Sequence, residues 1–185
     1  MLLLRGAETA VYLDPDIYVF GSLSKIAELS AEHGIVLTPH AIKPIPRDGL
    51  RPTEADIMGS GVYNLGFIGV GKDNVPMLHW WQERLRRDSI AAPEQMLFTD
   101  QRWIDLVPGL WDCAILRDPG YNVAYWNLDS RPVERRDGAL YAGCHLLRFF
   151  HFSGYRHETP WILSKYVADN PRVVLSEHPV VAELC

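Results

Sequence analysis

Apolar and polar positions alternate along the chain in blocks that predict strands and helices in turn. Short apolar runs at 10–13, 35–38 and 63–70 are typical of buried strands, since each is bounded by charged residues, glycine or proline. Between the first two, residues 22–33 carry apolar side chains at helical spacing, and Gly34 is a suitable C-terminal stop. The first third of the chain therefore predicts a strand, a helix and a second strand.

The rest of the chain continues this alternation less regularly. A proline-rich loop at 39–52 and a short helix from Thr53 precede the strand at 63–70. Beyond it, the pattern predicts helices starting at Asn74, Pro93 and Pro160, and strands at 113–116, 140–142 and 146–152. Strands alternating with helices favour an α/β fold with a mixed, partly parallel sheet flanked by helices.

Length and composition narrow the class of protein. The 185 residues are expected to form a single domain, 1–185. A net charge of −5 and an isoelectric point near 5.8 argue against nucleic acid as a partner. Three cysteines without a close pair favour a reduced, cytoplasmic setting. The apolar runs are too short to span a bilayer, and peripheral association with a membrane stays compatible with the sequence.

Two carboxylates follow the first predicted strand. Asp14 and Asp16 flank Pro15, which biases the residue before it toward an extended backbone. Side chains two positions apart on an extended backbone point to the same side, so both carboxylates can reach one hard cation. A solvated Asp-Pro-Asp turn is the alternative, because both residue types are common in turns.

Two further segments place polar side chains in apolar strands. Asn64 lies at the start of a glycine-containing run, 63–71, whose glycines do not follow the dinucleotide-binding order. They predict instead a strand that another segment or a ligand approaches closely. Asn64 needs a partner there, either a sugar hydroxyl or a neighbouring carbonyl. His151 ends an aromatic strand, where a histidine is a satisfied core residue or a ligand, and His145 at the same parity is expected to share its face.

Taken in order, these segments resemble a known enzyme family. The chain is similar to nucleotide-sugar glycosyltransferases of the GT-A fold, in the retaining family that includes glycogenin and the lipopolysaccharide galactosyltransferases. The matching motifs are Asp14-Pro15-Asp16, Asn64-Leu65-Gly66, Asp100-Gln101, and His151-Phe152-Ser153-Gly154 followed by Pro160-Trp161. They extend over most of the chain, from about residue 10 to residue 161.

The resemblance implies a metal-dependent sugar transfer. It assigns Asp14, Asp16 and His151 as ligands of Mn²⁺, or of Mg²⁺, which holds the donor diphosphate. Asn64, Asp100 and Gln101 match positions that line the sugar and acceptor pocket. The implied partners are a nucleotide-sugar donor and a glycan or lipid-linked acceptor, and the implied outcome at the anomeric carbon is retention.

The sequence departs from the family pattern at both ends. Between Gly154 and Pro160 the family carries a lysine that is missing here, and Arg156 is either its replacement beside the donor phosphate or a solvated loop residue. Ten residues precede Val11, too few for the nucleotide-binding strands that come first in the family.

We therefore expect the C-terminal part of a GT-A domain, incomplete at its N-terminus. A longer form is expected to be catalytic, whereas this chain alone is either inactive or a remnant that binds a glycan or a protein. Apolar sheet edges left exposed by the missing strands would favour self-association. A metal-dependent hydrolase that uses the same Asp pair is a weaker reading, because spacing marks no general base.

Overall fold

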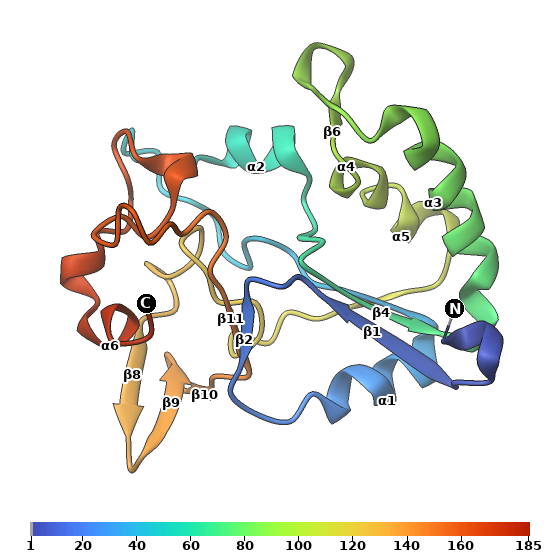
Figure 1. Ribbon diagram of the computed structural model, residues 1–185, viewed down its shortest axis with the longest axis horizontal. Coiled ribbons are helices and arrows are strands. Elements are labelled where there is room, and N and C mark those ends of the chain that lie inside the picture. Colours follow the sequence, from blue (N-terminus) through green and yellow to red (C-terminus); the bar gives the residue numbers. More distant parts are fainter. Residues whose placement is uncertain (1) are drawn as a thin grey trace. The chain divides into compact units, whose positions relative to one another are not determined.

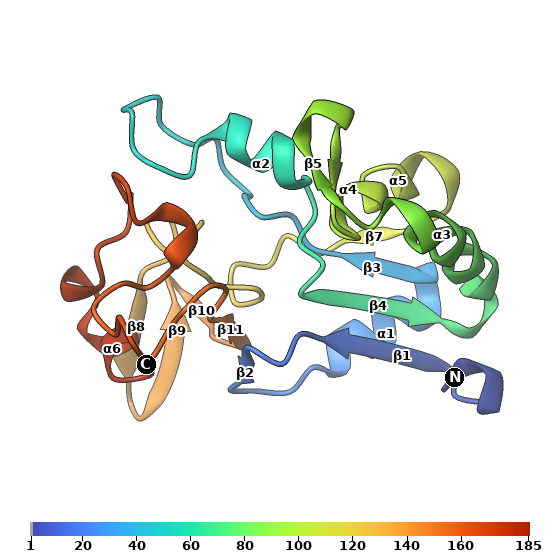
Figure 2. The ribbon, with the colours of Figure 1, turned by 45° about the horizontal axis from the view of Figure 1, so that its top comes forward.

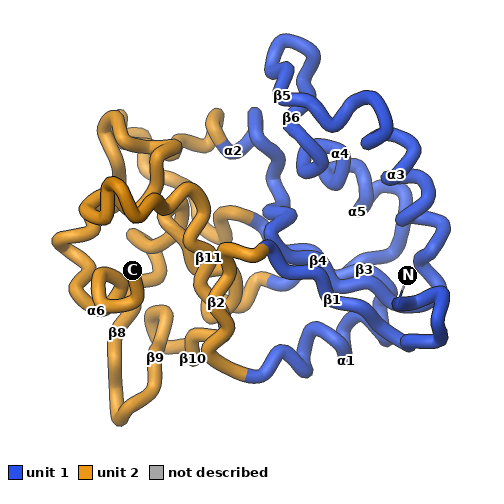
Figure 3. Tube along the Cα trace, in the orientation of Figure 1, with its two compact units in different colours: residues 1–14, 22–39, 57–116 blue, residues 15–21, 40–56, 117–185 orange. Residues whose placement is uncertain are grey.

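The computed structural model describes residues 2–185 and has a mixed α/β architecture (Figure 1). This confirms the fold class that the alternating pattern predicts. The chain forms two compact units, each assembled from three separate segments (Figure 3). Unit 1 contains the chain up to Asp14 with residues 22–39 and 57–116, and unit 2 contains residues 15–21, 40–56 and 117–185.

The elements are short, and the strands outnumber the helices. The strands are β1 (Thr9–Leu13), β2 (Ile17–Val19), β3 (Ile35–Leu37), β4 (Phe67–Gly71), β5 (Ala91–Ala92), β6 (Leu97–Phe98), β7 (Ala114–Ile115), β8 (Val133–Arg136), β9 (Ala139–Ala142), β10 (His145–Leu146) and β11 (Phe149–His151). The α-helices are α1 (Ser24–His33), α2 (Glu54–Ser60), α3 (Val75–Asp88), α4 (Gln101–Ile104), α5 (Val107–Leu110) and α6 (Pro179–Ala182). Single 3₁₀ turns lie at Leu3–Arg5, Lys72–Asn74, Pro93–Gln95, Lys165–Val167 and Leu175–Glu177.

Unit 1 is built on a four-stranded sheet in the order β1-β4-β3-β7 (Figure 2). Only β3 and β7 run parallel, and the other two pairings are antiparallel. Ile68 and Val70 of β4 belong to a buried apolar cluster with Met77 of α3, Ile104 of α4 and Val107 of α5. One face of the sheet is therefore closed by these three helices.

The opposite face of β4 carries glycine because α1 lies directly on it. A Cβ atom at Gly69 would lie 2.4 Å from Ser30 Oγ and 2.9 Å from Ile26 Cγ2, both on α1. One at Gly71 would lie 2.4 Å from the Ser30 carbonyl oxygen. These distances are shorter than real Cβ contacts, so a side chain would push the helix off the sheet. Gly69 and Gly71 therefore allow the close approach of a second segment, one of the two uses predicted for the glycines of this run.

Unit 2 contains two small antiparallel sheets. One is a meander in the order β10-β9-β8, and the other pairs β2 with β11. Val123 forms a parallel bridge to Phe150 and so extends the second sheet. The buried core of this unit consists of Val123, Leu128, Val133, Ala142, Leu147, Phe150, Leu163, Val173, Leu175 and Val181.

Several predicted elements differ in the structure. The segment from Pro93 makes a 3₁₀ turn and a two-residue strand, because Met96 takes a left-handed φ of 58°. The stretch 146–152 divides between β10 and β11, so His145 and His151 lie on separate strands and the shared-face prediction is wrong. Pro160 begins no helix, and the chain makes a turn closed by Ile162 N–H and the Thr159 carbonyl at 3.0 Å. Among residues 2–185, no helix combines the length and apolarity that a membrane crossing requires.

The outer edge of β1 has no partner strand in the described chain. Lys72 N–H donates to the Glu8 carbonyl, and Asp14 N–H to the Gly66 carbonyl. Along an antiparallel pairing, hydrogen-bonded residue pairs alternate with pairs that are not hydrogen-bonded to each other. The N–H and C=O groups of Thr9, Val11 and Leu13 therefore point away from β4. Such a row of free groups is a template for pairing with another chain.

This geometry predicts that proline is tolerated at Val11 and not at Val36. Val11→Pro removes an N–H that bonds to no strand, whereas Val36 lies between β4 and β7. We expect Val36→Pro to lower the free energy of unfolding by about 3 kcal/mol or more, and Val11→Pro by less than about 1 kcal/mol. Urea denaturation measures both values. Equal losses would contradict the assigned edge. We also expect Val11→Pro to weaken concentration-dependent self-association in sedimentation experiments.

A buried arginine fastens the proline-rich loop within unit 2. Arg172 donates to both carboxylate oxygens of Asp48 at 2.8 Å each, and to the Pro46 and Leu50 carbonyls at 3.2 Å. Its side chain is only 5% exposed. One guanidinium group therefore contacts three residues of this loop.

The loop contact predicts a component of stability that is lost in acid. The hydrogen bonds from Arg172 lower the pKa of Asp48 from 3.8 to about 2. A lowered pKa in the folded state stabilises above the unfolded value, so this contribution disappears as pH falls from about 4 to about 2. We expect the stability difference between wild type and Asp48→Asn to shrink over this interval in urea denaturation at graded pH. Arg172→Gln should behave in the same way, and a difference that stays constant would rule out the ion pair as its cause.

Candidate functional site

The Asp-Pro-Asp segment forms a turn between β1 and β2. Pro15 and Asp16 are in turn conformation, which corrects the expectation of a fully extended backbone through both carboxylates. The fixed φ of proline suits the first central position of a turn as well as a strand. The turn places Asp16 directly before Ile17, the first residue of β2. The pairing of β2 with its neighbouring strand then fixes the position of Asp16.

Backbone pairing brings Asp16 and His151 together within unit 2. Ile17 of β2 is the register partner of His151 in β11, and Phe152 N–H donates to the Asp16 carbonyl at 2.9 Å. On its other side, His151 N–H donates to the Val123 carbonyl at 2.8 Å. The two side chains meet at 3.1 Å between Asp16 Oδ1 and His151 Nε2. The position of the histidine is therefore fixed by backbone bonds on both sides.

The pair joins a buried imidazole to a half-exposed carboxylate. The side chain of His151 is 3% exposed and that of Asp16 44%. The hydrogen bond from His151 lowers the pKa of the Asp16 carboxyl below its ordinary value, outweighing the opposite effect of partial burial. Asp16 is thus ionised at neutral pH and acts only as an acceptor. The arrangement offers an oxygen and a nitrogen donor at the surface of unit 2.

An aromatic ring holds the imidazole from the side. Trp126 meets the His151 ring edge-on at 5.3 Å between centroids and the His40 ring at 5.0 Å. Sequence reasoning assigned Trp126 no role and left His40 without a distinguishable signal. The polar residues Asn122 and Asn127 within the apolar run 121–128 were the available signal, since buried amides mark an ordered polar network.

Asp14 ends unit 1 and is linked to Asp16 through Pro15 alone. A carboxylate oxygen of each lies within 4.8 Å of one of the other. Asp14 Oδ1 accepts a 2.6 Å hydrogen bond from the hydroxyl of Tyr12, which lies two positions earlier on the same side of the strand. The spacing of the motif therefore keeps the two acids close, as the sequence predicts.

The predicted residues Asn64 and Gln101 contact each other in unit 1. Asn64 Nδ2 donates to Gln101 Oε1 at 3.2 Å, and the same oxygen accepts from Leu65 N–H at 3.0 Å. Gln101 Nε2 donates to the Ser60 carbonyl at 2.8 Å. One partner of Asn64 is thus a side-chain amide rather than a main-chain carbonyl. Asp100 precedes α4, and its Oδ1 accepts from Thr99 Oγ1 at 3.1 Å.

Gly154 and Arg156 lie in the turns that follow β11. Gly154 has a φ of +75°, and a Cβ atom there would lie 2.7 Å from Ser164 Oγ and from a ring carbon of Tyr166. Its carbonyl accepts from Lys165 N–H at 3.0 Å. Glycine is therefore required by this crossing of two segments. Arg156 is exposed, and its carbonyl closes a turn with Thr159 N–H at 3.1 Å.

Two proteins of Bacillus subtilis (strain 168) resemble this chain in sequence. The "Uncharacterized protein YfnF" is 31% identical over 156 residues, which cover 80% of this chain and 50% of that protein. The "Uncharacterized protein YfnD" is 27% identical over 156 residues, covering 80% of this chain and 47% of that protein. The chain thus spans about half the length of the curated relatives it matches. No protein-family profile matches it.

The contacts of Gln101 predict a structural cost when its amide is removed. Gln101→Ala leaves Leu65 N–H, the Ser60 carbonyl and the Asn64 amide without this partner in a buried environment. We expect the free energy of unfolding to fall by about 3 kcal/mol, since each such group costs about 1 to 3 kcal/mol. Urea denaturation measures the loss. Gln82→Ala, on the exposed surface of α3, is the matched control and should change stability by less than about 0.5 kcal/mol.

Proposed function

We propose that this protein is a metal-dependent glycosyltransferase that moves a sugar from a nucleotide-diphosphate donor to a glycan or lipid-linked acceptor. The observation that carries the proposal is the contact between Asp16 and His151, which come from opposite ends of the chain. Those two residues belong to separate motifs of the resemblance. Their contact, made where β2 pairs with β11, supports the view that the ordered motifs form one functional arrangement and are not chance matches of short patterns.

The donor atoms fit Mn²⁺ or Mg²⁺. Carboxylate oxygens and a neutral imidazole suit Mn²⁺, and oxygen donors suit Mg²⁺. Neighbouring ligands of an octahedral ion, each about 2.1 Å from it, lie about 3 Å apart. The 3.1 Å between Asp16 Oδ1 and His151 Nε2 matches that separation. Asp14, two positions from Asp16 along the chain, supplies the next carboxylate. When bound, such an ion neutralises charge on the departing diphosphate.

In this proposal, different residues of the chain bind the metal ion, the sugar and acceptor, and the donor phosphates. A carboxyl with the ordinary pKa of aspartate is ionised at neutral pH, and the contact with His151 lowers the pKa of Asp16 further, so its carboxylate can accept a cation. Asn64, Asp100 and Gln101 are the proposed residues of the sugar and acceptor pocket. The bonds of Gln101 to backbone groups suit a positioning residue that orients Asn64. Arg156 and Gly154 are the proposed contacts of the donor phosphates.

The activity proposed here belongs to the whole protein. Retention at the anomeric carbon, a cytoplasmic setting and peripheral membrane association are parts of the same proposal. The matched region is about half of the length of the relatives. We propose that the half outside this region provides the nucleotide pocket. This chain is proposed to contribute the metal ligands and the acceptor side.

Metal binding by the 185-residue chain tests the proposal. We expect Mn²⁺ to bind with a stoichiometry of one in titration calorimetry, and UDP or GDP to bind through the diphosphate, only when Mn²⁺ is present. Asp16→Asn removes the carboxylate charge with little change in shape, so we expect Mn²⁺ affinity to fall by about tenfold or more. His151→Gln and Asp14→Asn should each weaken binding as well.

The control is Asp137→Asn, in the exposed turn between β8 and β9 of the same unit. It should leave Mn²⁺ affinity unchanged. Thermal denaturation of each variant without metal separates loss of a ligand from loss of the fold. Wild-type Mn²⁺ affinity in a folded Asp16→Asn variant would remove Asp16 from the ligand set and, with it, the main support for the proposed activity.

A further inference from the structure

A hollow in unit 2 has a composition unlike that of the rest of the chain. It has a volume of about 460 Å³ and lies beside β2, β9 and β10. Its wall is formed by Tyr18, Phe20, Gly21, Arg135, Gly138, Ala139, Leu140, Leu146, Leu147, Arg148 and Leu184. None of these side chains is acidic, although the chain carries a net charge of −5.

The apolar part of the wall is exposed more than packing alone requires. Tyr18 and Leu146 are 62% and 43% exposed. Tyr18 and Phe20, two positions apart in sequence, bring their rings to 4.8 Å between centroids. Large apolar side chains gathered around a hollow are typical of a binding site rather than of ordinary surface.

The basic part of the wall offers a guanidinium group to a ligand. Arg148 lies across Gly21, where a Cβ atom would be 3.3 Å from its Nη1. No carboxylate is paired with Arg148 among the described residues, whereas Arg135 contacts Glu183 at 3.1 Å. Arg148 therefore offers its charge to the hollow, and a guanidinium group favours a phosphate, which carries more charge and more acceptor oxygens than a carboxylate.

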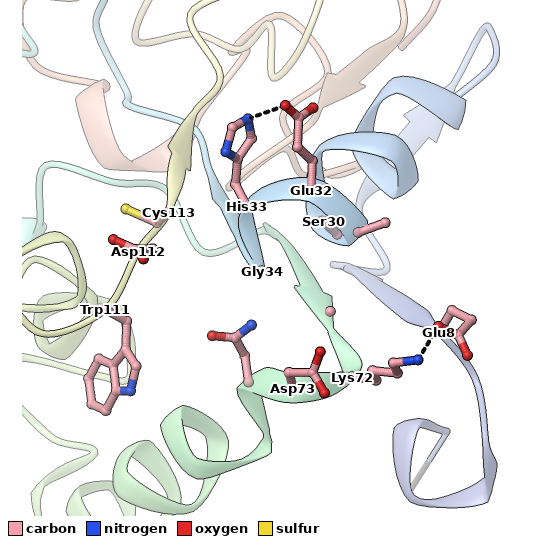
Figure 4. Close-up of a pocket in the computed structure, with 13 residues that line it drawn as sticks. Glu8, Ser30, Glu32, His33, Gly34, Lys72, Asp73, Trp111, Asp112 and Cys113 are labelled. Carbon is pink, nitrogen blue, oxygen red and sulfur yellow. Dashed lines mark ion pairs between the residues drawn. The ribbon is translucent and has the colours of Figure 1, made fainter.

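The hollow of unit 1 shows the opposite character. It has a volume of about 570 Å³, and its wall includes Glu32, Asp73 and Asp112 (Figure 4). Its lysine, Lys72, is already paired with Glu8 at 2.6 Å. An anionic ligand is therefore favoured by the hollow of unit 2 and disfavoured by that of unit 1.

The other side chains of the wall indicate which kind of molecule would carry the phosphate. Apart from the Tyr18 hydroxyl, the wall has no hydroxyl, amide or carboxylate side chain to bond the hydroxyl groups of a sugar. We propose that this hollow binds the phosphate end of an apolar molecule, with the phosphate against Arg148 and the apolar chain against Tyr18, Phe20 and Leu146. This site is separate from Asp16 and His151 and does not depend on the metal.

Binding of octyl phosphate to the full chain, measured by calorimetry, tests the proposal. We expect saturable binding at one site, and an affinity about tenfold lower or worse in Arg148→Gln, because a charge-assisted hydrogen bond is lost. Leu146→Asp, at an exposed position, should weaken binding by a similar factor. Arg117→Gln, an exposed arginine of unit 2 outside the hollow, is the matched control and should bind as wild type does.

Three comparison ligands complete the test. 1-Octanol and inorganic phosphate should each bind at least tenfold more weakly than octyl phosphate, since each lacks half of the recognised chemistry. Octanoate binding more tightly than octyl phosphate would overturn the choice of phosphate. Unchanged binding by a folded Arg148→Gln variant, or no binding by wild type, would overturn the site. Asp16→Asn should leave octyl phosphate binding unaltered, so failure here is distinguishable from failure of the metal site.

Discussion

The antiparallel pairing of β2 with β11 is the constraint on which the contact between Asp16 and His151 depends. It is only three residues long, yet it aligns Ile17 with His151 and so places the carboxylate of Asp16 beside a buried imidazole. A hydrogen bond between side chains this far apart in sequence cannot hold itself in place, because ordering two mobile groups costs more entropy than one bond returns. The backbone hydrogen bonds between β2 and β11 order both residues before their side chains meet. The bridge between Val123 and Phe150 holds β11 on its other side.

The two units treat their buried polar groups in different ways. In unit 1 the amide of Gln101 has partners for both its oxygen and its nitrogen, which is the behaviour of a structural group. In unit 2 the segment beneath His151 is less well satisfied. Both side-chain polar atoms of Asn122 and the indole nitrogen of Trp126 are buried without a protein partner. Each such atom costs of order 1 to 3 kcal/mol, and groups of this kind are concentrated where function limits what the fold can optimise.

The sequence predicts the helices and strands that depend on local periodicity. It does not predict features that depend on contacts between residues far apart in the chain. Helices α1 and α3 and strand β3 follow from apolar spacing and from stops such as Gly34, and the closeness of Asp14 and Asp16 follows from the chain itself. The break between β10 and β11 does not. Leu147 N–H donates to Leu140, while the next residue, Arg148, donates to Gly120, so the chain changes neighbours within one step. Likewise, no local sequence pattern predicts the contact between the rings of Trp126 and His151.

The spacing of β2 and β11 along the chain also sets an order of events during synthesis. The residues of β2 leave the ribosome about 130 positions before those of β11, and at about 5 to 20 residues translated per second this interval lasts roughly 7 to 26 seconds. Through that interval β2 has no strand to pair with, although β1 and β4 can already meet. The nascent chain can thus form the sheet beside Asp14 before the imidazole that completes the pair with Asp16 has been synthesised.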